Sequence, residues 1–156
     1  MNKELLVNQM EALKTTMELA VVNEQAIDMK SYITHYVNGM HMCDSVCCVI
    51  GDQVIYGDLT YFETTSDLKF ASVSFKLLAI YAACDLDNAC EDFLGDEGLS
   101  ESIWMSRTPL RKDGAKRSEL FTPEELDSLP HLNTEPTAQD VVDYLTLCIA
   151  KVEALS

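Results

Sequence analysis

The apolar repeat at the start of the chain is the feature that most constrains its fold. Apolar side chains recur there at intervals of four, three, four and three residues, at Leu6, Met10, Leu13, Met17 and Ala20. Charged side chains such as Glu4, Glu11 and Glu18 fall between them. This is the period of a helix with one buried face. We therefore predict an amphipathic helix over residues 3–22, with Asn2 as its cap.

The same period and capping signals predict further helices along the chain. They begin at Asp28, at Asp44 or Ser45, at Ser66 or Asp67, at Leu86, at Ser100, at Thr122 and at Thr137. The first of these should reach Met40, the third Cys84 and the fourth Leu94, with Gly95 and Gly98 as breakers. A strand is the competing interpretation for residues 46–56, which contain Val and Ile. Residues 57–66 are predicted to form a loop.

In the last predicted helix, an apolar face made by Val141, Tyr144, Leu145, Cys148 and Val152 should point inward. The chain has 156 residues with only 6 Gly and 4 Pro, a length and composition typical of one folded domain. We thus expect an all-α fold, a compact single-domain bundle of about six or seven helices over residues 1–156. Residues 107–117 carry five of the 11 basic side chains and no apolar period, which predicts an exposed basic loop at about 107–121.

The cysteines and the N-terminus bear on the compartment. Cys84, Cys90 and Cys148 stand among apolar residues at helical spacing, as small buried side chains do in a reducing compartment. No apolar run is long enough for a membrane span, and the N-terminus lacks the pattern of an export signal. We expect a cytoplasmic protein with no membrane contact.

The net charge of −15 restricts the classes of partner. Direct binding to nucleic acid needs clustered Lys and Arg, so neither nucleic acid nor an anionic membrane is an expected partner. A basic protein is the natural complement. The alternative is that the charge only keeps the protein soluble.

The acidic residues are concentrated in one interval. No Lys or Arg occurs between Lys76 and Arg107, where the chain carries Asp85, Asp87, Glu91, Asp92, Asp96, Glu97 and Glu101. We interpret these seven as a partner-binding surface on helices, with Asp87, Glu91 and Asp92 pointing outward. Such a surface can present charge where a nucleic-acid-binding protein expects phosphates. A solvated face without function is the alternative. The sequence contains no motif for catalysis or for a cofactor, and we expect neither.

A second hypothesis rests on a cluster of metal-ligating and nucleophilic side chains, namely His35, His41, Cys43, Cys47 and Cys48. Zinc prefers thiolate and imidazole ligands, so His41, Cys43 and Cys47 are its candidate ligands. No second cysteine pair follows downstream, as structural zinc sites usually require. Cys43 precedes a predicted helix start, which favours a thiolate, whereas the neighbouring Asp44 opposes it. This alternative is a small metal-binding or thiol-active protein.

Several short motifs occur in a familiar order, and they are spread over residues 26–150. They are Asp28-Met29, then Cys43-x-x-x-Cys47-Cys48-Val49-Ile50-Gly51, then Ala89 to Gly95 with Ser100 and Trp104, then Pro136-Thr137. This order resembles a loose group of small all-helical bacteriophage proteins. This chain has Asp44-Ser45 where that group has Gly-Thr, and Asp52 where the group often has His or Trp.

The resemblance implies a bacteriophage origin and a helical fold, and the group has no settled activity. Phage accessory proteins of this size often bind and inhibit host proteins, an analogy of origin rather than of site. We therefore expect a non-enzymatic inhibitor that acts in the cytoplasm of an infected bacterium. Its partner would be a basic host protein of nucleic-acid handling or defence.

Overall fold

The computed structural model of the chain describes residues 2–24, 36–37, 40–41, 49–68, 75–95, 98–104, 120–122, 124–125 and 137–155. Its helices are α1 (Asn2–Val22), α2 (Val49–Tyr56), α3 (Glu63–Leu68), α4 (Phe75–Leu94), α5 (Gly98–Trp104) and α7 (Ala138–Glu153). Two strands of two residues each, β1 (Tyr36–Val37) and β2 (Met40–His41), pair antiparallel. The described residues confirm the predicted all-α class.

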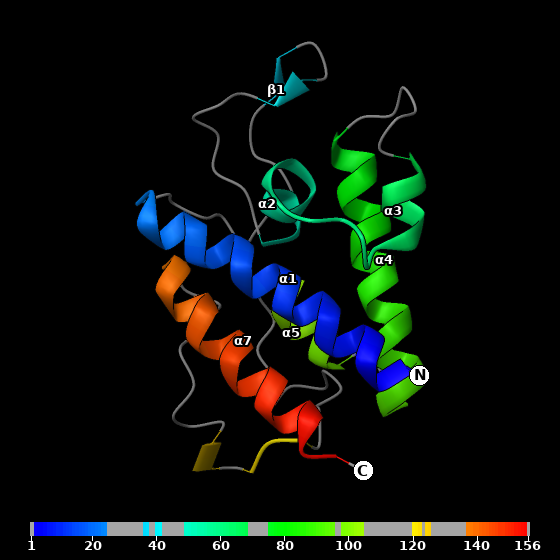
Figure 1. Ribbon diagram of the computed structural model, residues 1–156, viewed down its shortest axis with the longest axis vertical. Helices are drawn as coiled ribbons and strands as arrows, with labels where there is room; N and C mark the ends of the chain where they lie inside the picture. The colour runs from blue at the N-terminus through cyan, green and yellow to red at the C-terminus, as the bar shows by residue number, and fades with distance from the viewer. Residues whose placement is uncertain are drawn as a thin grey trace, which may run out of the picture.

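The first and last helices form an antiparallel pair (Figure 1). α1 packs along α7, and it also contacts α4 and α2. The apolar faces predicted for α1 and α7 are buried throughout, which confirms both helices and their orientation. At one end of the pair, Lys3 Nζ donates hydrogen bonds to the backbone carbonyls of Glu153, at 2.9 Å, and Leu155. A cation is favourable there because the carbonyls of a helix C-terminus carry partial negative charge.

α4 passes α1 near the N-terminal end of α1, and α2 packs against both helices (Figure 1). The buried face of α4 is rich in small side chains, because Ala79, Ala82, Ala83 and Ala89 alternate with Leu78 and Leu86. Side chains from α1, α2, α4, α5 and α7 join in one apolar cluster. Burial of this cluster is the main driving force for the fold.

α4 combines parts of two predicted helices, and the predicted start at Ser66 or Asp67 is wrong because both residues lie inside α3. The chain was expected to form separate helices ending at Cys84 and beginning at Leu86, but a single helix runs from Phe75 to Leu94. Gly95 ends it as predicted, with φ +82° and its N–H donating to the Glu91 carbonyl at 2.8 Å. This is the left-handed terminus that glycine favours. Gly98, however, begins α5 instead of terminating α4.

The predicted loop over residues 57–66 is wrong from Glu63 onward, where α3 begins. The N-terminal turn of α3 is capped from another helix, since the Asp85 carboxylate on α4 accepts hydrogen bonds from Thr65 N and Thr65 Oγ1, both at 3.4 Å. A helix N-terminus leaves N–H groups that need such acceptors. The acceptor lies 20 residues downstream, which a local window cannot detect.

The helix predicted from Asp28 to Met40 is wrong over its described end. Tyr36 pairs with His41 and Val37 with Met40 across β1 and β2. The sequence between the strands is Asn38-Gly39, and this dipeptide is a strong hairpin signal that outweighs the helical period here. Residues 28–35 lie outside the described part. For residues 49–56 the helical alternative is confirmed and the strand is wrong.

Two predicted helix starts are confirmed by their hydrogen bonds. Thr137 and Asp140 form a reciprocal capping box at the start of α7, and Thr122 and Glu125 exchange the same pair of bonds. The predicted exposed loop at 107–121 is wrong at its end, where Phe121 is buried with its ring centroid 6.2 Å from that of Tyr144. Residues 107–117 lie outside the described part.

Candidate protein-binding surface

Only part of the predicted acidic surface is both described and exposed. Glu91 and Asp92 are exposed in the last turns of α4. The backbone of Glu101 lies in α5, whereas Asp96 and Glu97 lie outside the described residues. Glu91 and Asp92 stand near the C-terminus of their helix, where negative charge is unfavourable by about 0.3–1 kcal/mol each.

Asp85 and Asp87 both point toward neighbouring helices, and for Asp87 this corrects the outward orientation that was predicted. Asp87 is half-buried and accepts a hydrogen bond from Ser100 Oγ of α5, while Ser100 itself is buried. Asp85 is half-buried at the start of α3. Burial raises the pKa of Asp85, and hydrogen bonds from Thr64 and Thr65 partly oppose that rise. Both carboxylates therefore accept hydrogen bonds from neighbouring helices.

Exposed carboxylates occur well beyond α4. Glu4, Glu11 and Glu18 recur every seven residues and form one exposed stripe along α1. The exposed acidic side chains of the described residues are Glu4, Glu11, Glu18, Glu24, Asp58, Glu63, Asp67, Glu91, Asp92, Glu124, Asp143 and Glu153.

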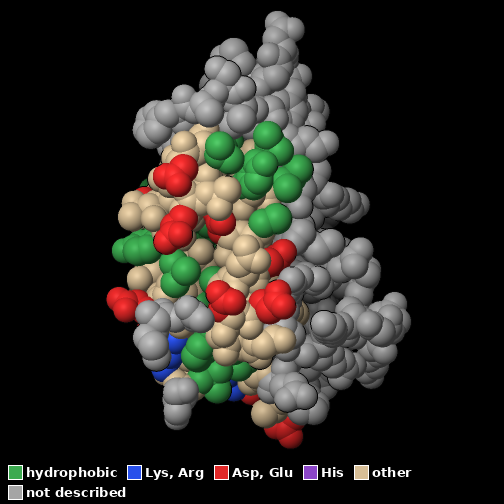
Figure 2. All heavy atoms as spheres, turned by 90° about the vertical axis from the view of Figure 1, so that its right-hand side faces the viewer, with side chains coloured by type: hydrophobic (Ala, Val, Ile, Leu, Met, Phe, Trp, Pro, Cys, Tyr) green, Lys and Arg blue, Asp and Glu red, His purple; other side chains and the backbone are tan. Residues whose placement is uncertain are grey.

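Basic side chains are placed differently. Within the described residues, the lysines with described side chains are Lys3, Lys14 and Lys151, and each is partly buried. Lys3 bonds to the end of α7, and Lys151 forms an ion pair with Glu125. That pair and a hydrogen bond from Thr122 lower the pKa of Glu125. The face that carries α3 and α4 shows scattered acidic side chains, and blue side chains appear only at its lower edge (Figure 2). The described surface is thus strongly anionic.

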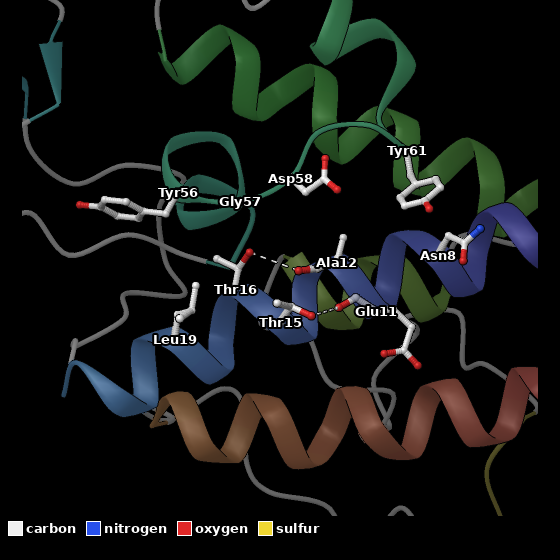
Figure 3. A pocket seen from close by; sticks show the side chains of 10 residues that line it. All are labelled: Asn8, Glu11, Ala12, Thr15, Thr16, Leu19, Tyr56, Gly57, Asp58 and Tyr61. Atoms are coloured by element: carbon white, nitrogen blue, oxygen red, sulfur yellow. Dashed lines mark hydrogen bonds between the residues drawn. The ribbon is translucent and has the colours of Figure 1, made fainter.

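A groove of about 310 Å³ lies between α1 and the connection from α2 to α3 (Figure 3). One wall is a stripe of α1 with side chains at helical spacing, namely Asn8, Glu11, Ala12, Thr15, Thr16 and Leu19. The other wall consists of Tyr56, Gly57, Asp58 and Tyr61. We call this feature the α1 groove. Both walls contribute a carboxylate, so the groove itself is acidic.

Large apolar side chains around the α1 groove remain open to solvent. Leu19 is 51% exposed, Tyr56 48% and Tyr61 37%. The two tyrosines stand toward opposite ends of the groove (Figure 3). Exposed tyrosines beside a concave surface are typical of protein-binding sites, because they offer apolar area together with a polar group.

Two buried glutamines connect the walls of the α1 groove. Gln9 Nε2 of α1 donates to the Tyr61 carbonyl at 2.9 Å. Gln53 of α2 accepts from Thr16 Oγ1 at 2.5 Å and donates through Nε2 to the Asp58 carbonyl at 2.6 Å. These bonds cross from one wall to the other, so the shape of the groove is set without a ligand.

Sequence reasoning missed the α1 groove. The heptad spacing of Glu4, Glu11 and Glu18 was visible, but it was interpreted only as the polar face of an amphipathic helix. Tyr56 lay at the end of a segment for which helix and strand both stayed open, and Asp58 lay in the predicted loop. No local signal links that loop to α1, because the link is made by Gln53 and Gln9 through tertiary contacts.

The cysteines are placed only partly as predicted. Cys90 and Cys148 are buried, as expected, but Cys84 is exposed on the outer side of α4. Burial raises the pKa of the Cys148 thiol and raises that of the buried Tyr144 hydroxyl, which shares a hydrogen bond with Ser102 Oγ. Both groups stay protonated at neutral pH, so neither is an activated nucleophile.

The zinc and thiol hypothesis stays a prediction. His35, Cys43, Cys47 and Cys48 lie outside the described residues, and of His41 only the backbone in β2 is described. In the part of the chain that is described, no group of three or more His, Cys, Asp or Glu side chains is arranged to hold a metal ion.

No protein-family model, curated protein or solved structure matches this chain. Among the helices that the structure describes, none combines the length and the apolarity needed to cross a lipid bilayer.

Proposed function

We propose that this protein is a non-enzymatic, phage-type accessory protein that binds and inhibits a basic host protein of nucleic-acid handling or defence. The observation that carries the proposal is the distribution of charge. Exposed carboxylates cover α1, α3, α4 and α7, while the lysines with described side chains are all partly buried. A surface of this kind attracts a basic protein and repels nucleic acid.

The position of some carboxylates supports a role beyond helix formation. Glu91 and Asp92 oppose the dipole of α4 at its C-terminal end, and no basic residue occurs in the last turn of this helix. They therefore reduce the stability of the helix that bears them. A binding function accounts for this cost, since the charges stand on a rigid helix and lose little conformational entropy in a complex.

The spacing of the carboxylates on a single helix is too wide to reproduce the charge density of DNA. Carboxylates seven residues apart along α1 are separated by about 10.5 Å along the helix axis. Duplex DNA carries one negative charge per about 1.7 Å of axis. Mimicry of DNA thus requires carboxylates from several helices together, and the proposal extends to α1, α3 and α4 as one surface.

A pull-down tests the proposal. The immobilised protein should retain a basic protein from bacterial lysate at low ionic strength and release it as salt approaches about 1 M. The retained protein should have its nuclease or DNA-binding activity reduced by the complex. Failure to retain any basic protein at low salt, or retention that ignores salt, would contradict the proposal.

A variant pair locates the charges involved. Glu91→Gln with Asp92→Asn should slow association with the retained protein, because charges on the surface steer encounter more than they hold the complex. Asp143→Asn with Glu153→Gln on α7 changes the net charge equally and is the control. Equal association rates for the two double variants would remove α4 from the binding surface.

A further inference from the structure

The geometry points to the α1 groove as the docking site for an arginine side chain of the basic partner. This inference rests on the proposed function, because it names the group by which a basic protein is held. The observations that support it differ from those behind the proposed function. They are the shape and the lining of one concave site, whereas the proposed function depends on the charge of the whole surface.

Charge in the α1 groove complements a cation. Glu11 projects from one wall and Asp58 belongs to the other, and the described lining contains neither Lys nor Arg. Asp58 Oδ1 accepts hydrogen bonds from Thr60 N at 2.9 Å and Thr60 Oγ1 at 2.6 Å, which hold the carboxylate in a turn. The two carboxylates point away from each other (Figure 3), so a cation at this site bonds to Asp58, and Glu11 adds negative charge along the α1 wall.

The aromatic side chains select arginine over lysine. Tyr56 and Tyr61 stand toward the two ends of the groove, and both rings are partly exposed to solvent (Figure 3). A guanidinium group is planar, weakly hydrated and able to stack on a tyrosine ring while it bonds to a carboxylate. The compact ammonium of lysine lacks that planar face. Leu19 supplies apolar surface for the methylene groups of the arginine.

Size and rigidity fit a single anchor residue. A volume of about 310 Å³ lies at the lower end of the range for ligand pockets, enough for one long side chain and the adjoining peptide. The bonds of Gln9 and Gln53 hold the walls in place before the partner arrives. A pre-formed site loses little free energy to ordering when it binds.

The test measures binding of a fluorescently labelled octa-arginine peptide to the whole protein at low salt, with octa-lysine for comparison. Octa-arginine should bind more tightly than octa-lysine. Glu11→Gln with Asp58→Asn should weaken octa-arginine binding by about three- to tenfold, and Tyr61→Leu by about threefold. Asn at position 58 keeps an oxygen that can accept from Thr60, so the turn survives the substitution.

The matched control is Asp143→Asn with Glu153→Gln on α7, which changes the net charge by the same amount away from the groove. Equal weakening by both double variants, or equal affinity for the two peptides, overturns the groove assignment and leaves the proposed function standing. If octa-arginine fails to bind while the lysate partner is retained, the groove assignment is likewise overturned and the proposed function stands. Self-association that the groove variants abolish would assign the groove to a second copy of the chain instead.

Discussion

Replacing Gly57 with alanine tests the buried contact that sets one end of the α1 groove. A Cβ atom at this position would lie 2.5 Å from Nε2 and 2.6 Å from Oε1 of Gln53, closer than atoms pack in proteins. The backbone of Gly57 is outside the left-handed region, so the expected effect is a steric clash and not strain in φ. Gln53 is fully buried and cannot escape into solvent.

The size of the effect follows from the bonds of Gln53. Its displacement breaks the hydrogen bond from Thr16 Oγ1 and the one to the Asp58 carbonyl, each with a net contribution of about 1 kcal/mol. Overpacking adds about 1–3 kcal/mol. The single hydroxyl hydrogen of Thr16 can then be donated to the Ala12 carbonyl, 3.2 Å from Oγ1, which limits the loss. We expect the free energy of unfolding to fall by about 2–4 kcal/mol.

A double-mutant cycle isolates this contact. Urea unfolding followed by circular dichroism should show that Gly57→Ala costs under about 0.5 kcal/mol in a Gln53→Ala background, because the colliding atoms are gone. Gly95→Ala is the control, with no atom within 4 Å and φ +82°. It should cost about 1 kcal/mol in both backgrounds. An equal cost of Gly57→Ala in both backgrounds would refute the steric explanation.

Three further outcomes are expected from the described contacts. Because burial raises the pKa of Asp85, its protonated form favours the fold, and this stability is lost as pH rises through the folded-state pKa. Asp85→Asn should therefore gain stability relative to the unmodified protein as pH rises above about 4, the ordinary pKa of an aspartate, and a difference independent of pH would contradict this. Thr137→Ala should lower the free energy of unfolding by about 1 kcal/mol, measured in urea, since it removes the cap of α7. Brief alkylation and peptide mapping should find Cys84 labelled before Cys148, and the reverse order would contradict the burial of Cys148.

The periodicity of the sequence was sufficient to predict the two helices at its ends. Leu6, Met10, Leu13 and Met17 of α1 are all buried, and Thr137 begins α7 with the predicted capping box. These features depend on residues within four positions of one another, so a local pattern contains the whole cause. The helix predicted across β1 and β2 is wrong because two local signals compete there. The turn-forming dipeptide Asn38-Gly39 outweighs the helical period of the apolar residues.

The tertiary structure decides which carboxylates are exposed to solvent. Asp85, Asp87, Glu91 and Asp92 are chemically alike and close in sequence, and nothing local distinguishes them. Asp85 is directed inward by the N-terminus of α3 and Asp87 by Ser100 of α5. Of these four carboxylates, those of Glu91 and Asp92 are the exposed ones.

The sequence alone determined the class of fold, the end helices and the sign of the surface, because composition and short-range period carry that information. The tertiary structure alone decided where a partner can be held. The α1 groove has Glu11 on one wall and Asp58 and Tyr61, about fifty residues further along the chain, on the other. Gln9 connects the walls through its hydrogen bond to Tyr61, 52 residues downstream. Contacts at that separation depend on how helices pack, and packing is a property of the whole chain.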